Sequence, residues 1–294
     1  MKSDATPAPD HQWSELTRLV RHGAMPSDTA SVPHAPTLTK AEGRHLLHGA
    51  NRSLVALQEA LYAQGTDGLL VVLQGLDTAG KDGTSRAIFD GVNPQGVVVH
   101  GFKVPTPYEA AHDYLFRIHA AVPGRGEIGV FNRSHYEDLI VPLATGSLNE
   151  HDLLARIQEI HQFERYLRDQ HIVIVKLYLH VSYEVQGKRL LRRLDRPDKH
   201  WKFSPNDLVT REHFESYANA YRRIIPATSF DEAPWHIVPA DHKWYRNAIA
   251  AAIVNDALTQ LAPHAPSVDI AHIQKIRATL EGELHRHHTE DQPG

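Results

Sequence analysis

The sequence contains no cysteine among its 294 residues. This absence excludes a disulfide framework, a thiolate metal site and a cysteine nucleophile, and it agrees with a reducing compartment. The sequence also lacks any apolar run near the roughly 20 residues that span a membrane. The segment after Met1 is polar and lacks the apolar core of a signal peptide. We therefore expect a cytoplasmic protein with no membrane partner.

Positive charge is also scarce overall, because 31 lysines and arginines face 35 acidic residues for a formal net charge of −4. A general nucleic-acid binder needs a broadly basic surface, so nucleic acid is not an expected partner. Any polyanion site must instead be a local basic patch. The hydrophobic share of 41% is enough for one large α/β domain with a full core.

The chain divides into an N-terminal arm, one large domain and a C-terminal segment. Residues 1–38 mix Pro, Ser, Ala, His and Asp with one short apolar stretch, so we expect a flexible arm. Leucines recur every three or four residues over 40–63, which predicts an amphipathic helix at the start of a domain over 39–262. We expect a C-terminal helix and a solvated, histidine-rich polar tail over 263–294.

Five short runs rich in Val, Ile and Leu alternate with longer segments of helical period. The runs cover residues 69–74, 97–102, 128–131, 172–179 and 235–238. Short apolar runs separated by helices are typical of parallel strands whose two faces are both covered. The sequence therefore predicts an α/β fold with three αβα layers and a five-stranded parallel sheet.

A glycine-rich segment directly follows the first of these runs. Residues 75–81, here called the phosphate loop, match the G-x-x-x-x-G-K (Walker A) pattern between a predicted strand and a helix that begins near Gly83. Backbone N–H groups, the helix N-terminus and Lys81 would all direct positive charge at phosphate. We assign phosphate or nucleotide contacts to Thr78, Ala79, Gly80, Asp82, Gly83 and Thr84. The alternative is a tight turn with a surface lysine.

Two aspartates set this loop apart from the usual pattern. Asp82 occupies the position where a serine or threonine usually binds magnesium, so another group must hold the metal. Asp77 is the candidate, because a carboxylate in a phosphate-binding loop repels the ligand unless a divalent cation or a proton transfer involves it. In the alternative, Asp77 only accepts loop N–H bonds and Asp82 only complements the helix dipole.

Charged residues also follow the third predicted strand, over 132–138. The carboxyl ends of strands form the ligand crevice in a doubly wound sheet, so this segment should face the phosphate loop. Arg133 is then placed to stabilise a transferring phosphoryl group. Glu137 has a second interpretation, because Ser134 and Glu137 match a helix capping box. We interpret His135 as a structural or rim residue and not as a phosphohistidine.

The segment after the fourth predicted strand is strongly basic. From residue 188 to 202 it has seven basic and two acidic residues, a local charge of +5. A continuous helix would align Arg189, Arg192, Arg193 and Arg196 in one stripe, where they repel one another unless an anion lies among them. The segment thus predicts a polyanion track, which Lys103 and Arg117 would extend. The alternative is a solvated amphipathic face.

Together these features resemble the polyphosphate kinase 2 family, over residues 40–255. The resemblance rests on the phosphate loop with its two aspartates and on residues 93–96, 102–105, 112–117, 131–138 and 197–202. It implies a thymidylate-kinase-like fold with a helical lid over about 184–210. It also implies reversible, Mg²⁺-dependent phosphoryl transfer between polyphosphate and nucleoside mono- or diphosphates, with Mn²⁺ as a substitute metal and ATP regeneration as a use.

The resemblance also implies roles for single residues. Asp77 would orient the accepting phosphate and help to hold the metal, while Lys81 and Arg133 would neutralise the phosphoryl group. Asn132, Glu137 and Asp138 would shape the nucleotide-phosphate side, and Asp82 resembles members that also accept monophosphates. The predicted polyphosphate-binding residues are Lys103, Arg117, Arg189, Arg192, Arg193, Lys199 and Lys202. Members form dimers or tetramers, so a homo-oligomer is expected.

Two other functions share parts of this pattern. An ATP-dependent nucleoside-monophosphate kinase has the same loop and lid but needs no polyphosphate. A non-catalytic polyphosphate- or nucleic-acid-binding module would bind without turnover. The aspartates of the loop and the basic segment together favour the phosphate chain as donor, so polyphosphate:nucleotide phosphotransfer is our main prediction.

Overall fold

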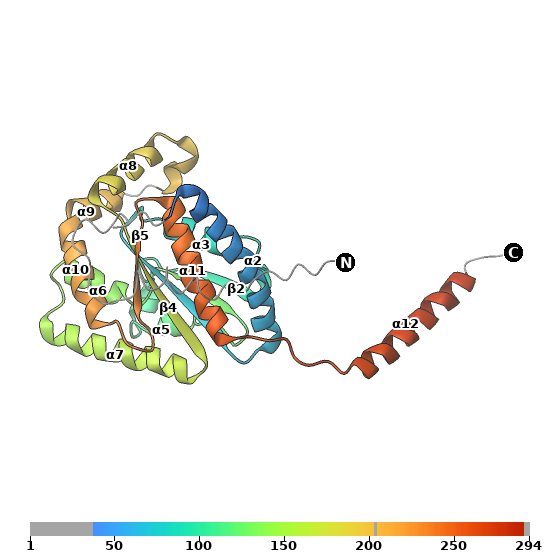
Figure 1. Cartoon of the computed structure of the whole chain (residues 1–294). Coiled ribbons are helices and arrows are strands. Elements are labelled where there is room, and N and C mark those ends of the chain that lie inside the picture. Colours follow the sequence, from blue (N-terminus) through green and yellow to red (C-terminus); the bar gives the residue numbers. More distant parts are fainter. Residues whose placement is uncertain (1–37, 203–204, 291–294) are drawn as a thin grey trace.

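The computed structural model describes residues 38–202 and 205–290, and the remaining residues are drawn in grey in Figure 1. The predicted N-terminal arm therefore lies, except for Leu38, outside the described residues. Side chains at 202–206 and 286–290 are likewise not described, which includes the predicted polyphosphate ligand Lys202. Within the described ranges no helix is both long enough and apolar enough to cross a membrane.

Five parallel strands form one sheet in the order β2-β3-β1-β4-β5. The strands are β1 (Gly68–Gln74), β2 (Val97–Gly101), β3 (Ile128–Asn132), β4 (Ile172–His180) and β5 (Trp235–Pro239). All seven residues of β1 are buried, as expected for a central strand covered on both faces. The prediction of a five-stranded parallel sheet is confirmed, with strand ends within two residues of the expected ones.

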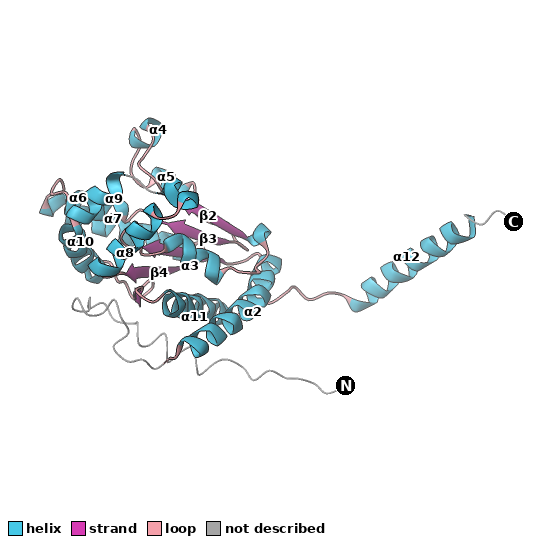
Figure 2. Cartoon of the chain, turned by 90° about the horizontal axis from the view of Figure 1, so that it is seen from above, coloured by secondary structure: helices cyan, strands magenta, loops and turns pink. Residues whose placement is uncertain are grey.

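Helices cover both faces of the sheet, which confirms the three-layer prediction (Figures 1 and 2). One layer contains α2 (Lys40–Gln64), α3 (Lys81–Ile88) and α11 (Lys243–Leu261), which contact one another. The other contains α6 (Glu137–Ala144), α7 (Glu150–Asp169) and α10 (Phe214–Ala227). Short helices α4 (Pro107–Ala110) and α5 (Phe116–His119) follow β2, and the 3₁₀ turn η2 (Pro94–Gly96) precedes it.

Local sequence explains where several of these helices begin. Thr39 and Glu42 form a capping box at the start of α2, with two reciprocal side-chain to backbone hydrogen bonds. The Asn149 side chain accepts a hydrogen bond from the backbone N–H of Asp152 and so caps α7. The left-handed Gly65 ends α2 before the chain enters β1.

The lid and the C-terminal segment lie outside the three layers. The segment predicted to form the lid contains α8 (Tyr183–Leu194), the 3₁₀ turn η3 (Pro197–Lys202) and α9 (Pro205–Glu212). Because α8 ends at Leu194, the predicted single-helix stripe of four arginines is wrong for Arg196, which lies beyond the helix. After a connecting segment comes α12 (Ile270–Glu290), which points away from the layers (Figures 1 and 2).

Candidate active site

The phosphate loop joins the end of β1 to the start of α3 in a tight turn. Gly75 and Gly80 both have positive φ angles, of 151° and 105°. A Cβ atom at Gly75 would lie 2.7 Å from the carbonyl oxygen of Leu179, and one at Gly80 would overlap the Arg246 guanidinium. Thr78 also has a positive φ of 66° although it is not a glycine, a strained conformation that often marks functional sites.

Lys81 is the first residue of α3, and its side chain folds back over the loop. Its ammonium donates to the carbonyl oxygens of Gly75 at 2.6 Å and Leu76 at 3.4 Å. Burial lowers the pKa of Lys81, and the nearby Arg133 lowers it further, while Asp77, Glu137 and Asp82 oppose the shift. A largely buried cation held only by carbonyls gains most when an anion reaches it.

Arg133 reaches the phosphate loop from the end of β3. Its guanidinium Nη2 lies 2.8 Å from Asp77 Oδ1, and Nη1 lies 3.7 Å from Glu137 Oε2. Its backbone φ is +63°, a strained value for a residue other than glycine. Burial works against the charge of Arg133, but Glu137 and Asp77 outweigh it and raise the pKa of the guanidinium. The structure therefore brings Lys81, Asp77, Arg133 and Glu137 into one charged cluster.

Glu137 belongs to this cluster and does not cap a helix. The first turn of α6 has Tyr136 at its N-cap with no side-chain cap, so the capping-box interpretation of Ser134 and Glu137 is wrong. The Ser134 hydroxyl instead accepts hydrogen bonds from the Gln74 side chain and from the Tyr136 N–H. Burial raises the pKa of Glu137, against the opposing effects of Arg133 and Lys81.

The remaining predicted nucleotide-side residues lie around this cluster. The Asn132 amide donates to Asp82 Oδ1 and so joins β3 to α3. Asp138 lies 3.9 Å from Arg117, and burial raises the pKa of Asp138 although this arginine and Arg156 oppose the shift. Along the loop and α3, Ala79 and Thr84 are fully buried, Thr78 is nearly so, and Asp82 and Gly83 are exposed.

Two arginines outside the phosphate loop donate hydrogen bonds to its backbone carbonyl oxygens. Arg189 of α8 donates to the carbonyl oxygens of Thr78 at 3.0 Å and Ala240 at 2.6 Å. Arg246 of α11 donates to the Ala79 carbonyl at 2.9 Å, and burial with the nearby Arg189 lowers the pKa of Arg246 to about 10. The Arg189 guanidinium is thus engaged with backbone, and its predicted contact with polyphosphate stays a prediction.

The other predicted chain-binding residues differ in how they are held. Arg193 lies 3.4 Å from Asp207, and Lys199 lies 3.3 Å from Asp198. Arg192 is exposed on α8. Lys103 is exposed after β2, whereas the Arg117 side chain is only 9% exposed and donates to the Lys103 carbonyl at 2.7 Å. Arg193 and Lys199 therefore have carboxylate partners within the predicted lid, whereas Arg192 and Lys103 are exposed.

A family model described as polyphosphate kinase 2 matches residues 37–266, which is most of the chain. This chain belongs to the polyphosphate kinase 2 family. It is therefore an enzyme of the kinase or phosphotransferase type, and the family and enzyme class predicted from the sequence are confirmed.

Named relatives and a solved structure agree with this assignment. An AMP/ADP-polyphosphate phosphotransferase from Meiothermus ruber is 46% identical over 221 residues, which are 75% of this chain and 83% of the relative. An ADP-polyphosphate phosphotransferase from Rhodopseudomonas palustris is 34% identical, covering 81% and 86% of the two chains. The crystal structure of polyphosphate kinase 2 from Arthrobacter aurescens superposes with a TM-score of 0.85 at 38% identity, over 90% of this chain and 96% of the other.

In this polyphosphate kinase 2 member a buried hydrogen-bond network contacts the residues that follow Arg133. Lys176 of β4 donates to Glu164 Oε2 at 2.7 Å, to the Tyr136 hydroxyl at 2.9 Å and to the Thr228 carbonyl at 2.7 Å. Glu164 also accepts from Tyr136 at 2.7 Å, and His135 lies 3.3 Å away. His135 is therefore a structural residue, as its interpretation from the sequence proposed.

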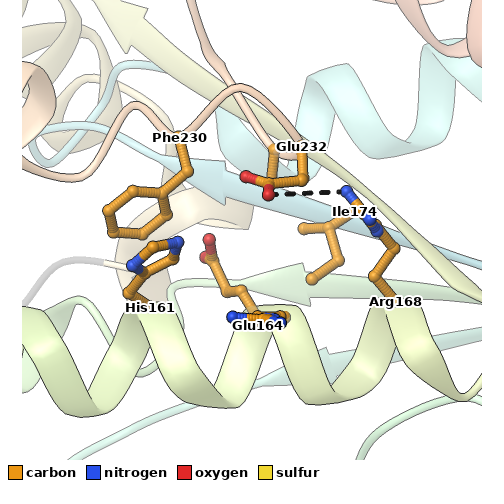
Figure 3. A pocket seen from close by; sticks show the side chains of 8 residues that line it. His161, Glu164, Arg168, Ile174, Phe230 and Glu232 are labelled. Carbon is orange, nitrogen blue, oxygen red and sulfur yellow. Dashed lines mark ion pairs between the residues drawn. The ribbon is translucent and has the colours of Figure 1, made fainter.

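A small cavity adjoins this network between α7 and the turn before β5. Figure 3 shows Glu164 pointing toward it, with His161 stacked on Phe230 and the ion pair of Arg168 and Glu232 at one side. The ring centroids of His161 and Phe230 lie 3.9 Å apart, and the ion pair measures 3.6 Å. None of the cavity's lining residues belongs to the phosphate loop, so this cavity is separate from the candidate active site.

Sequence reasoning missed Lys176, Glu164 and Arg246. Lys176 had a signal, because it interrupts the apolar run of β4 with a charge that burial makes costly without a partner. Arg246 had a similar signal in the alanine- and isoleucine-rich α11. Glu164 gave no signal in the sequence, because a glutamate in a charged amphipathic helix usually faces solvent.

Proposed function

We propose that this enzyme transfers phosphoryl groups reversibly between inorganic polyphosphate and AMP or ADP, forming ADP or ATP. The observation that supports it is the contact of Arg133 with Asp77 beside Lys81, which places two cations and a carboxylate around one phosphate-binding loop. Phosphoryl transfer depends mainly on positioning and on neutralising charge in the transition state. The cluster supplies both.

We assign the steps to the chain's own groups. Lys81 and Arg133 neutralise the transferring phosphoryl group, and backbone N–H groups of the loop hold its neighbour in the chain. Glu137, at 3.7 Å, keeps the Arg133 guanidinium in place. Asp77 faces the same guanidinium and orients the accepting phosphate. Asn132 and Asp138 shape the nucleotide-phosphate side.

The donor set also suits a divalent metal. Mg²⁺ typically uses one or two carboxylates and completes its shell with water and substrate phosphates. Asp77 and Asp82 both lie close enough to Lys81 to raise its pKa, and no cluster of three acidic or histidine ligands occurs among the described residues. We propose that Asp77 holds Mg²⁺ or Mn²⁺. The metal would neutralise charge on the bridging phosphate oxygens when bound.

The exposed basic groups of the lid are the proposed track for the rest of the chain. Arg192 is exposed on α8, and Arg193 and Lys199 would exchange their carboxylates for phosphate. Lys103 and Arg117 extend the track beside Asp138, and Lys202 and Arg189 complete the predicted set. We further propose a cytoplasmic location and a homo-oligomer, either a dimer or a tetramer.

The test uses purified enzyme with Mg²⁺ and three substrate mixtures. Polyphosphate with AMP should give ADP, and polyphosphate with ADP should give ATP. ATP with AMP, without polyphosphate, tests the nucleoside-monophosphate kinase alternative, and product in that mixture alone would overturn the proposal. Tight polyphosphate binding with no product in any mixture would instead indicate a binding module. GMP and GDP in parallel define the base preference.

A further inference from the structure

Arg246, near the start of α11, is a buried cation whose hydrogen-bond acceptors carry no charge. Its guanidinium Nη1 donates to the Ala79 carbonyl of the phosphate loop at 2.9 Å. Nε and Nη2 both donate to the Asn247 side-chain oxygen, at 3.1 and 2.7 Å. Among the described residues these two neutral oxygens are its acceptors, and Arg246 is only 3% exposed. Buried charges normally have a partner of opposite charge, so the cost of burying this one indicates a function at the loop.

The contact with Arg246 fixes the direction of the peptide between Ala79 and Gly80. No peptide bond in the described ranges is cis, so the Gly80 N–H points away from the Ala79 carbonyl and hence away from α11. In the part of the chain that the structure describes, this N–H has no acceptor, whereas the Ala79 N–H donates to the Leu76 carbonyl at 3.0 Å. The Gly80 N–H is therefore a donor that a phosphate oxygen can use.

This peptide needs an anchor because glycine allows the backbone to rotate. Gly80 has a φ of 105°, and its backbone could adopt other conformations without steric cost. The Arg246 guanidinium lies directly against it, because a Cβ atom at Gly80 would overlap that group. Arg189 also donates to the Ala79 carbonyl, at 3.3 Å, but it comes from α8 outside the three layers. Arg246 comes from α11, which contacts α2 and α3 within a layer, so it is the donor fixed to the domain core.

We infer that Arg246 is a positioning residue, which holds the Ala79 carbonyl toward α11 so that the Gly80 N–H is presented to the phosphate chain. Asn247 orients the guanidinium through its two hydrogen bonds. This role requires no contact between Arg246 and the substrate. It differs from the role of Arg133, which approaches the loop from the end of β3 and contacts Asp77. The inference rests on the proposed binding of phosphate by the loop, but not on which nucleotide accepts the phosphoryl group.

The first test observes this peptide directly by NMR. Ala79–Gly80 is the only Ala-Gly dipeptide in the sequence, so labelling alanine with ¹³C at the carbonyl and glycine with ¹⁵N selects a single amide resonance, that of Gly80. In the parent, tripolyphosphate with Mg²⁺ and without nucleotide should shift this resonance. In Arg246→Met, half of the shift should require roughly 10-fold more tripolyphosphate or beyond, by analogy with residues that orient metal ligands.

The outcomes of this titration separate the two proposals. An equal midpoint in the parent and in Arg246→Met would overturn the positioning role and leave phosphate binding by the loop intact. A Gly80 resonance that does not move in the parent would contradict the binding of phosphate by the loop, and with it both proposals.

The second test separates positioning from a loss of stability. Arg246→Met should lower kcat/KM for polyphosphate by about 10- to 100-fold, the range typical of residues that orient metal ligands. Arg246→Lys should recover part of this loss, because an ammonium can still donate to the Ala79 carbonyl although it lacks the planar fork of arginine. Ile253→Ala is the matched control, because it removes buried groups from the same helix about two turns further along.

The control should lower the melting temperature, as large-to-small substitutions in a core do, and leave kcat/KM unchanged. A parental kcat/KM in Arg246→Met would overturn the inference. An equal loss of kcat/KM in Ile253→Ala would also overturn it, because the effect would then follow stability and not the direction of the peptide.

Discussion

Two buried lysines, Lys81 at the start of α3 and Lys176 in the middle of β4, have opposite surroundings. Burial lowers the pKa of both. Lys176 donates to a carboxylate, a hydroxyl and a carbonyl, so its charge is compensated within the protein. The ammonium of Lys81 donates to two loop carbonyls, and the carboxylates near it pair with Arg133 or Asn132. The comparison indicates that Lys176 stabilises the fold, whereas Lys81 is available to bind an anionic ligand.

The largest expected effect is on turnover and comes from substitution of Lys81. Lys81→Ala should lower kcat by about 100- to 1,000-fold, because one group that stabilises transition-state charge is typically worth about 2.7 to 4 kcal/mol. Its melting temperature should not fall, since the variant removes a buried charge that has no carboxylate partner of its own. Lys188→Ala is the matched control, because that lysine is exposed on α8. Near-parental turnover of Lys81→Ala would refute its assigned role.

Substitution of Lys176 should instead lower the stability of the fold. Lys176→Met leaves Glu164 buried without its cation, which typically costs about 3 to 5 kcal/mol in the free energy of unfolding. Adding Glu164→Gln removes the stranded charge and should recover part of that loss. Denaturant titration of the single and double variants measures both effects. A Lys176→Met protein as stable as the parent would show that the comparison between the two lysines is wrong.

The sequence predicted the parts of this enzyme that depend on pattern. The apolar runs located the five strands, and the spacing of Gly75, Gly80 and Lys81 located the loop, because both follow from local backbone needs. Support for the loop could not be predicted in the same way. Arg189 and Arg246 donate to backbone carbonyls, which every residue carries, so no sequence pattern identifies their partners.

The error at Ser134 has a similar origin. The spacing of Ser134 and Glu137 satisfies a capping box, but the Gln74 side chain, 60 residues earlier in the chain, donates to the Ser134 hydroxyl at 3.1 Å. Glu137 is then left to face Arg133, so a tertiary contact overrides the local motif. The end of α8 was mispredicted at Arg196 because basic spacing alone contains no signal for where a helix stops.

A third prediction concerns pH, through Glu137. Burial raises its pKa above 4.5, so it takes up a proton at a pH where an exposed glutamate is still ionised, and Arg133 then loses a counter-charge. The kcat of the parent should therefore decrease as pH falls through the raised pKa of Glu137. Glu137→Gln should have a lower kcat at pH 7, but its kcat should not show this decrease at acid pH. Between pH 4.5 and the raised pKa the folded state binds more protons, so Glu137's contribution to the free energy of unfolding decreases as pH rises.

The matched comparison for this profile is Glu184→Gln, because Glu184 is exposed and its pKa is lowered by its contact with Lys188. That variant should keep the parental pH profile of kcat. If Glu137→Gln also keeps the parental acid limb, another group causes it, and Asp138, whose pKa burial also raises, is the next to substitute.

The smallest expected effect is on KM for polyphosphate and comes from exposed basic groups of the lid. These groups are not buried like Lys176, and they do not lie beside the phosphate loop like Lys81. Arg192→Ala combined with Lys199→Ala should raise KM for long polyphosphate by a few fold, with a smaller change for short chains and little change in kcat. The salt dependence of KM should also decrease, since fewer counterions are released when fewer cations meet the chain, by analogy with other polyanions. Arg125→Ala, an exposed arginine in the loop that leads into the opposite end of β3, is the control. An unchanged preference for chain length would remove the lid from the polyphosphate track and leave Lys103 and Arg117 as its only proposed members beyond the phosphate loop.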